Sequence, residues 1–78
     1  MSRIATFFSH FGAVSFRRTC EAAGIPARLM PVPRSLSSSC GTCVRVEAQD
    51  AEQIPRTEES EQIALEEENG YRILWSNF

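Results

Sequence analysis

The 78-residue chain contains no lysine, a single histidine and no long apolar run. All eight basic residues are arginines, which suits the bidentate binding of anions but can equally reflect coding bias. No apolar stretch approaches the ~20 residues that span a bilayer, so we expect no transmembrane helix and no membrane partner. The N-terminal segment lacks the pattern of a secretory signal, and we therefore expect a cytoplasmic protein.

Cysteine is also scarce, and its three positions are Cys20, Cys40 and Cys43. An odd and sparse set of cysteines cannot all pair internally, so we do not expect a structural disulfide framework. The length suits one small domain, which we predict to span residues 1–78. A core of this size gives only marginal stability, which favours self-association, for example as a homodimer.

The two halves of the chain carry opposite charge. Residues 1–46 hold six arginines and one glutamate, whereas residues 47–78 hold nine acidic residues and two arginines. The basic residues are scattered and the net charge is -2, so the sequence does not indicate nucleic-acid binding. We interpret the acidic run 58–68 as a solvated helix face, with docking to a basic partner as the alternative.

The apolar pattern predicts four strands and two helices. Alternation of apolar and polar residues predicts strands over residues 3–9, 27–32, 42–47 and 71–76. Helical spacing predicts a first helix that Ser9 caps and that ends near Gly24. The second helix, over residues 57–68, rests on helix-forming residues with few apolar ones among them. Asp50 is expected to cap a short turn before it.

The order strand, helix, strand, strand, helix, strand predicts an α+β fold. It matches the ferredoxin-like βαββαβ plait, an antiparallel sheet with both helices on one face. Right-handed crossovers then place the first strand beside the third. The loop between the second and third strands would lie at the same end as the start of the first helix. We therefore expect Cys40, Cys43, Arg34, Ser9 and His10 to converge there.

The segment from Pro31 to Val46 carries the chemistry that we predict, because it combines two cysteines with an arginine and a run of serines. Cys40 precedes Gly41, which relieves steric crowding around the sulfur. The positive end of the first helix, the loop amides and Arg34 would each stabilise a thiolate. We therefore assign Cys40 as the nucleophile.

The other two cysteines receive different assignments. Cys43 either resolves a disulfide formed on Cys40 or is a small buried residue of a strand. Cys20 lies on the apolar stripe of the first helix, where a free cysteine behaves as a small hydrophobic residue. We assign Cys20 to core packing.

Polar neighbours of the cysteines are candidate binding residues, and each has a plainer alternative. His10 either orients the thiol and transfers a proton or is simply exposed at the start of the helix. Arg34 binds an anionic group such as sulfide, selenide or phosphate, or is solvated. Ser38 and Ser39 either supply hydroxyl and amide donors or belong to a flexible run. Ser9 joins this group through its place at the helix start.

Several motifs together resemble one family. They are Ser9 with Ala13 after an apolar strand, the run Ala22-Ala23-Gly24-Ile25-Pro26, and the loop Pro31-Val32-Pro33-Arg34-Ser35-Leu36-Ser37-Ser38-Ser39-Cys40-Gly41. This pattern, over about residues 7–46, resembles the selenium/sulfur (Se/S) carrier protein-like family of small bacterial and archaeal proteins. The resemblance implies a cytoplasmic role in handling sulfur or selenium, with the family cysteine at Cys40 and the preceding arginine at Arg34. The second half departs from the pattern, because Pro55 and the acidic run replace a regularly amphipathic helix.

Three classes of function remain open. The first is a carrier without a cofactor, which holds a persulfide or selenosulfide on Cys40 and exchanges it with donor and acceptor proteins. The second is a soft-metal module that binds Cu(I) or Zn(II) through Cys40 and Cys43. The third is a non-catalytic, dimeric interaction module that uses an open sheet face. We favour the carrier, and we expect a binding protein rather than a stand-alone enzyme.

Overall fold

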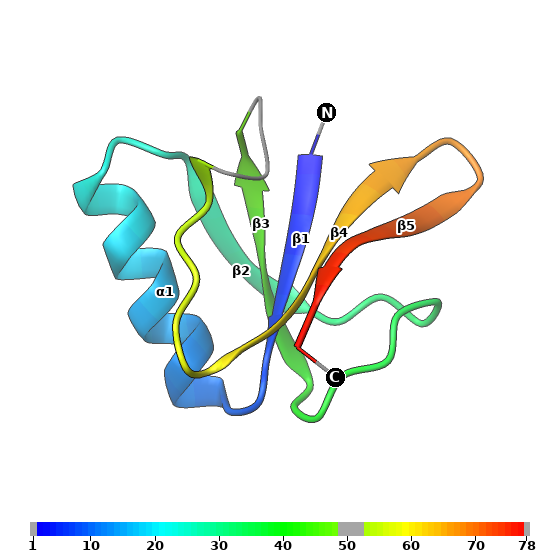
Figure 1. The fold of residues 1–78 in the computed structure, drawn as a ribbon, viewed down its shortest axis with the longest axis horizontal. Helices are drawn as coiled ribbons and strands as arrows, with labels where there is room; N and C mark the ends of the chain where they lie inside the picture. Colours follow the sequence, from blue (N-terminus) through cyan, green and yellow to red (C-terminus); the bar gives the residue numbers. More distant parts are fainter. Residues whose placement is uncertain (1, 49–52, 78) are drawn as a thin grey trace.

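A computed structural model describes residues 2–48 and 53–77. The five strands form one antiparallel sheet in the order β2-β3-β1-β4-β5, and α1 lies against one of its faces (Figure 1). The bounds of the elements are β1 Ser2–Phe7, α1 His10–Ala22, β2 Ala27–Pro31, β3 Thr42–Glu47, β4 Ser60–Glu67 and β5 Gly70–Ser76. No helix in the described ranges is long and apolar enough to cross a membrane.

The predicted start and end of α1 are confirmed. Ser9 is the N-cap, and its Oγ accepts a hydrogen bond from the Gly12 amide at 3.0 Å. After the helix, Gly24 adopts a φ of 76°, a left-handed conformation that glycine reaches without strain. The Ile25 amide then donates to the Cys20 carbonyl at 2.8 Å, which closes the last turn.

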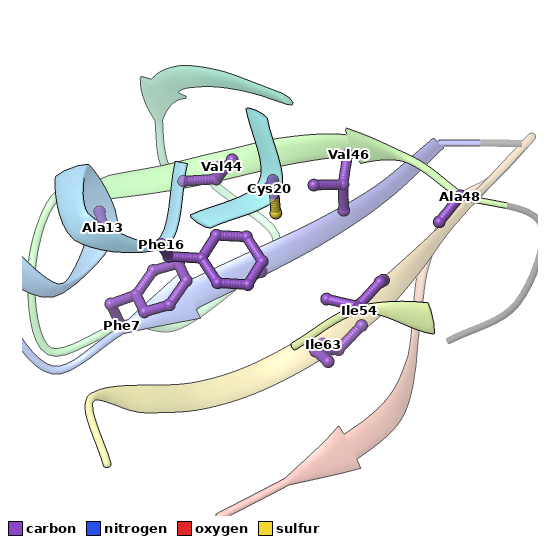
Figure 2. Packing of buried hydrophobic residues seen from close by; sticks show 10 residues of the cluster. Phe7, Ala13, Phe16, Cys20, Val44, Val46, Ala48, Ile54 and Ile63 are labelled. Carbon is purple, nitrogen blue, oxygen red and sulfur yellow. The ribbon is translucent and has the colours of Figure 1, made fainter. Parts of the chain in front are cut away.

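The main core lies between the sheet and α1. The rings of Phe7 on β1 and Phe16 on α1 pack with their centroids 4.8 Å apart (Figure 2). Cys20 is fully buried in the same cluster, as predicted. Ile54, from the connection between β3 and β4, belongs to this cluster and lies beside Ile63 of β4 (Figure 2). The buried members are Ala5, Phe7, Ala13, Phe16, Cys20, Val44, Val46, Ala48, Ile54 and Ile63.

The other face of the sheet has a smaller core of its own. Successive side chains of a strand point to opposite faces, so Ala5 of β1 faces α1 while Ile4 faces away. Ile4 packs with Cys43, Ala64 and Leu36, all of which are buried. Leu36 belongs to the loop between β2 and β3, so this loop covers the face that α1 leaves open.

The predicted second helix is wrong, because residues 60–67 form β4. The six residues from Ser60 to Leu65 are all buried, since β4 lies between β1 and β5. Pairing and burial on both faces outweigh the helix propensity of the glutamates. Glu67 pairs with Gly70 across a two-residue turn, so Asn69-Gly70 belongs to a hairpin rather than to a helix end.

The α+β class is confirmed, but the ferredoxin-like plait is not. β1 pairs with β3 as predicted, and β4 pairs with the other edge of β1. However, β4 takes the place of the predicted second helix, and β5 adds a fifth strand to the sheet (Figure 1). The predicted cap Asp50 lies outside the described residues.

Gly12 has no room for a side chain. A Cβ atom at this position would lie 2.6 Å from the Cβ of Glu59, whose carbonyl is held by the Phe8 amide at 3.0 Å. We predict that Gly12→Ala lowers the free energy of unfolding by about 1–3 kcal/mol, despite the ~1 kcal/mol gain in helix propensity. Urea denaturation measures this difference.

Gly41→Ala is the matched control. A Cβ at Gly41 meets nothing within 4 Å, and this residue does not have a positive φ. The free energy of unfolding of Gly41→Ala should stay within about 0.5 kcal/mol of that of the parent protein. Equal stability of the two variants would contradict the close contact at Gly12.

Candidate functional site

The candidate site is the loop of residues 32–41, which joins β2 to β3 and lies across the sheet face opposite α1. Its apolar anchor is Leu36, whose amide donates to the Pro33 carbonyl at 3.0 Å. At the base of the loop, the Val32 amide donates to the Gly41 carbonyl at 3.1 Å. The loop therefore begins and ends in hydrogen-bonded positions and is pinned to the sheet at its middle.

Polar side chains of β4 hold the part of the loop that precedes Cys40. The carboxylate of Glu61 accepts the amide of Ser39 at 2.9 Å and its hydroxyl at 2.5 Å. The amide side chain of Gln62 donates to the Ser37 carbonyl at 2.6 Å. Ser38 donates to the Phe7 carbonyl at 3.4 Å. The serine run is thus hydrogen-bonded within the protein, and contacts from Ser38 and Ser39 to a ligand stay a prediction.

Cys40 is a half-buried residue at the end of this loop. Its Sγ lies 3.2 Å from the Thr42 carbonyl, to which the thiol donates a hydrogen bond. The adjoining Gly41 is exposed, and the space beside its Cα is open. The loop is therefore exposed to solvent immediately after Cys40.

His10 meets the same loop through Thr42. Its Nδ1 lies 3.0 Å from the Thr42 hydroxyl, while the carbonyl of Thr42 accepts the Cys40 thiol. The start of α1 and the end of the loop therefore converge on one residue that the sequence analysis did not single out. This much of the predicted convergence is present.

Ser9 and Arg34 do not take part in that contact. The Ser9 hydroxyl caps α1 and also donates to the carboxylate of Glu59, on the side of the β3–β4 connection. Arg34 is exposed in the turn that opens the loop. Among residues 2–48 and 53–77, no hydrogen bond or ion pair joins Arg34 to Cys40. Direct roles for Ser9 and Arg34 at the sulfur therefore stay predictions.

Cys43 lies close to Cys40 in sequence but in a different environment. It is fully buried in the smaller core, with its Sγ 3.6 Å from the Pro31 carbonyl. Burial raises the pKa of the Cys43 thiol to about 11, and the nearby Cys40 adds to this while Arg45 opposes it. A buried neutral thiol is a poor nucleophile, which weighs against the resolving role and leaves it a prediction.

The residues that the sequence analysis missed are Glu61, Gln62 and Thr42. The first two lie inside the predicted second helix, where the acidic run predicts a solvated helix face. The available signal was the apolar triplet at 63–65 followed by an Asn-Gly pair and an alternating strand, a pattern typical of a β-hairpin. Within the described residues, no group of three or more His, Cys, Asp or Glu side chains is arranged to hold a metal ion.

The different environments of the cysteines predict an order of reactivity. Treatment of the folded protein with iodoacetamide at neutral pH should modify Cys40 first, because Cys20 and Cys43 are buried and their pKa values are raised to about 11. Peptide mass spectrometry locates the adduct, and alkylation in denaturant provides the control in which all three react. Earlier labelling of Cys43 would contradict the assignment.

The two buried thiols also predict a loss of stability in alkali. Burial raises both pKa values from 9.0 to about 11, so folding favours the neutral thiol. This contribution is complete below about pH 9 and disappears as the pH rises towards 11, with about 2–3 kcal/mol per thiol as the upper limit. Denaturation curves should show this fall in the parent protein and a smaller one in Cys20→Ala. An identical fall in both proteins would contradict the role of Cys20.

Comparison with known proteins identifies a family. A family model described as "Putative Se/S carrier protein-like" matches residues 2–68. No curated protein matches the chain, and no solved structure does. The matched segment includes β1, α1, the loop with Cys40, and β4 with Glu61. Since the match covers most of the sequence, the chain belongs to the Se/S carrier protein-like family.

Proposed function

We propose that this protein holds a sulfur or selenium atom on Cys40, as a persulfide or selenosulfide, and passes it to a partner protein. The observation that carries the proposal is the contrast among three free cysteines, of which Cys40 alone is not buried. Membership of the family supports a carrier role in general. The hydrogen-bonded loop adds a fixed position for the sulfur, which a carrier needs more than a deep pocket.

The proposed loading step is an exchange that needs no external oxidant. The sulfur of Cys40 attacks the outer sulfur of a donor persulfide, a new S–S bond forms on Cys40, and the donor's S–S bond breaks. The donor leaves as a thiol that takes up the proton lost by Cys40. The attack of an acceptor nucleophile on the outer sulfur reverses these roles and returns Cys40 to the thiol. A donor selenosulfide delivers selenium by the same exchange.

The resting hydrogen bond of Cys40 must break before this exchange. A thiolate cannot donate to the Thr42 carbonyl, and it would be repelled by the partial negative charge of the carbonyl oxygen at 3.2 Å. We propose that the sulfur then turns outward on the side of the exposed Gly41. His10, whose Nδ1 lies 3.0 Å from the Thr42 hydroxyl, is a candidate to accept the proton.

The surface of the molecule fits exchange between proteins. Three surface hollows, with volumes of about 470, 380 and 280 Å³, are lined by residues other than Cys40. We therefore propose donor and acceptor proteins as the partners. The soft-metal module and the dimeric interaction module gain no support from the described residues. A homodimer and a cytoplasmic location stay predictions.

Intact mass spectrometry tests the loading step. Protein purified anaerobically is treated with glutathione persulfide, and the expected result is a mass gain of one sulfur atom that survives denaturation, maps to Cys40 and disappears with dithiothreitol. Cys40→Ser should lose this gain because it lacks the accepting thiol. Spectra recorded under native conditions also detect any metal, which would support the alternative.

Two further variants separate the cysteines. Cys43→Ala should still accept sulfur, since the buried thiol takes no part in the exchange. Cys20→Ser should accept sulfur but unfold at lower urea, because a polar atom enters the core. Sulfur on Cys43 in place of Cys40, or full loading of Cys40→Ser, would overturn the proposal.

A further inference from the structure

Glu61 carries a carboxylate at a buried position, where removing a charge from water is energetically unfavourable. It lies on β4 beside the central strand β1, and none of its surface is exposed. A buried carboxylate is tolerated only where hydrogen bonds replace its hydration. An apolar residue would fill the same space without the cost of losing hydration. We therefore look for a functional role of Glu61 rather than a contribution to stability.

A β-bulge aims Glu61 at the loop. Thr6 pairs with Gln62, and the next residue of β1, Phe7, pairs with Ser60, which leaves Glu61 as the extra residue of β4. Regular alternation would turn Glu61 towards α1, because Ile63 faces the main core. The bulge instead lets its side chain reach Thr6 on the opposite face, and bulges commonly redirect side chains in this way.

Both oxygens of the Glu61 carboxylate accept hydrogen bonds. Oε1 accepts the hydroxyl of Thr6 at 2.9 Å, and Oε2 accepts both the amide and the hydroxyl of Ser39. Burial acts to raise the pKa of Glu61, but the hydrogen bonds from Ser39 and Thr6 lower it and leave the pKa below its ordinary value. The group is therefore an anion at neutral pH, and all these donors point to it at once.

The residue that Glu61 holds immediately precedes the sulfur-bearing one. Ser39 is fixed through its backbone and its side chain, so the peptide that leads into Cys40 has a defined position. The Cys40 amide donates to the Ser38 hydroxyl at 3.4 Å, and its thiol meets Thr42. These contacts connect the buried anion to the orientation of the Cys40 side chain through the loop backbone.

We propose that Glu61 is a positioning residue for sulfur exchange at Cys40, acting through Ser39. The inference rests on the proposed function, since it concerns the same sulfur. Glu61 does not touch the reacting atoms. It holds the loop on the sheet so that the sulfur of Cys40 stands at the open edge beside Gly41 and meets a donor in one orientation. The structural alternative is that Glu61 merely stabilises the fold.

The first test is Glu61→Gln in the full-length chain. Glutamine keeps the size and one accepting oxygen, but its amide cannot accept the donors that the second oxygen receives. We expect the Ser39 amide to exchange with deuterium at least tenfold faster, while amides of β1 and β3 keep their protection. Transfer from glutathione persulfide to Cys40 should slow by about 10- to 100-fold, because misplacement of a reacting group has effects of this size.

Glu67→Gln is the matched control, because it makes the same change on the same strand at an exposed residue that pairs with Arg72 at 3.4 Å. Its transfer rate and its exchange at Ser39 should equal those of the parent protein. A folded Glu61→Gln protein that transfers sulfur at the parent rate would overturn the proposal, even if its stability has decreased. A slow rate at unchanged β1 and β3 protection supports it.

Ser39→Ala keeps the test decisive if Glu61→Gln does not fold. It removes one of the two donors of Ser39 and leaves the carboxylate hydrogen-bonded to Thr6. Slower transfer in stable Ser39→Ala supports the proposal, and an unchanged rate contradicts it. Where both variants fold, their double mutant should be no slower than the worse single variant, because the two changes break the same contact. Additive losses would count against action through Ser39.

The outcomes separate this inference from the proposed function. If the parent protein accepts no sulfur, the carrier function fails, and the exchange of the Ser39 amide still reports whether Glu61 fixes the loop. If the parent protein accepts sulfur on Cys40 and Glu61→Gln does so equally fast, the carrier function stands and the positioning role fails.

Discussion

The central strands need apolar cover on both faces, and this constraint organises the molecule. The helix α1 covers one face, and the described part of the chain has no second helix for the other. The loop of residues 32–41 takes this place through Leu36. A loop brings unpaired backbone groups with it, so the sheet must offer polar partners, and β4 provides Glu61 and Gln62. Cys40 lies at the end of this loop, so its position depends on the loop covering the sheet face.

The sequence allowed the N-terminal half of the fold to be predicted because its signals are local. Ser9 and Gly24 mark the ends of α1 by hydrogen bonds and by backbone conformation, and the alternation of residues 42–47 marks β3. The strand β4 was missed because its glutamates favour a helix when considered alone. This segment forms a strand because it pairs with β1, which is distant in the sequence, and with β5, which follows it.

The candidate site also has features that can be predicted from the sequence and features that cannot. The presence of Cys40 at the end of a turn-rich loop, and the core role of Cys20, can be predicted from the residues around them. The partners of Cys40 cannot, because they depend on where separate elements meet. Thr42 joins the thiol to His10 only because α1 starts beside the end of the loop. Glu61 reaches Ser39 only because a bulge displaces it, and no local pattern indicates that bulge.

For a persulfide proposed to form on Cys40, the burial of Cys43 affects how long that persulfide would last. A second thiolate beside a persulfide attacks its inner sulfur, releases hydrosulfide and leaves an intramolecular disulfide, so the cargo is lost. Cys43 is covered by the loop, and its pKa of about 11 keeps it uncharged at neutral pH. On the proposed carrier function, the loop that covers Cys43 would therefore also keep its thiol away from a persulfide on Cys40.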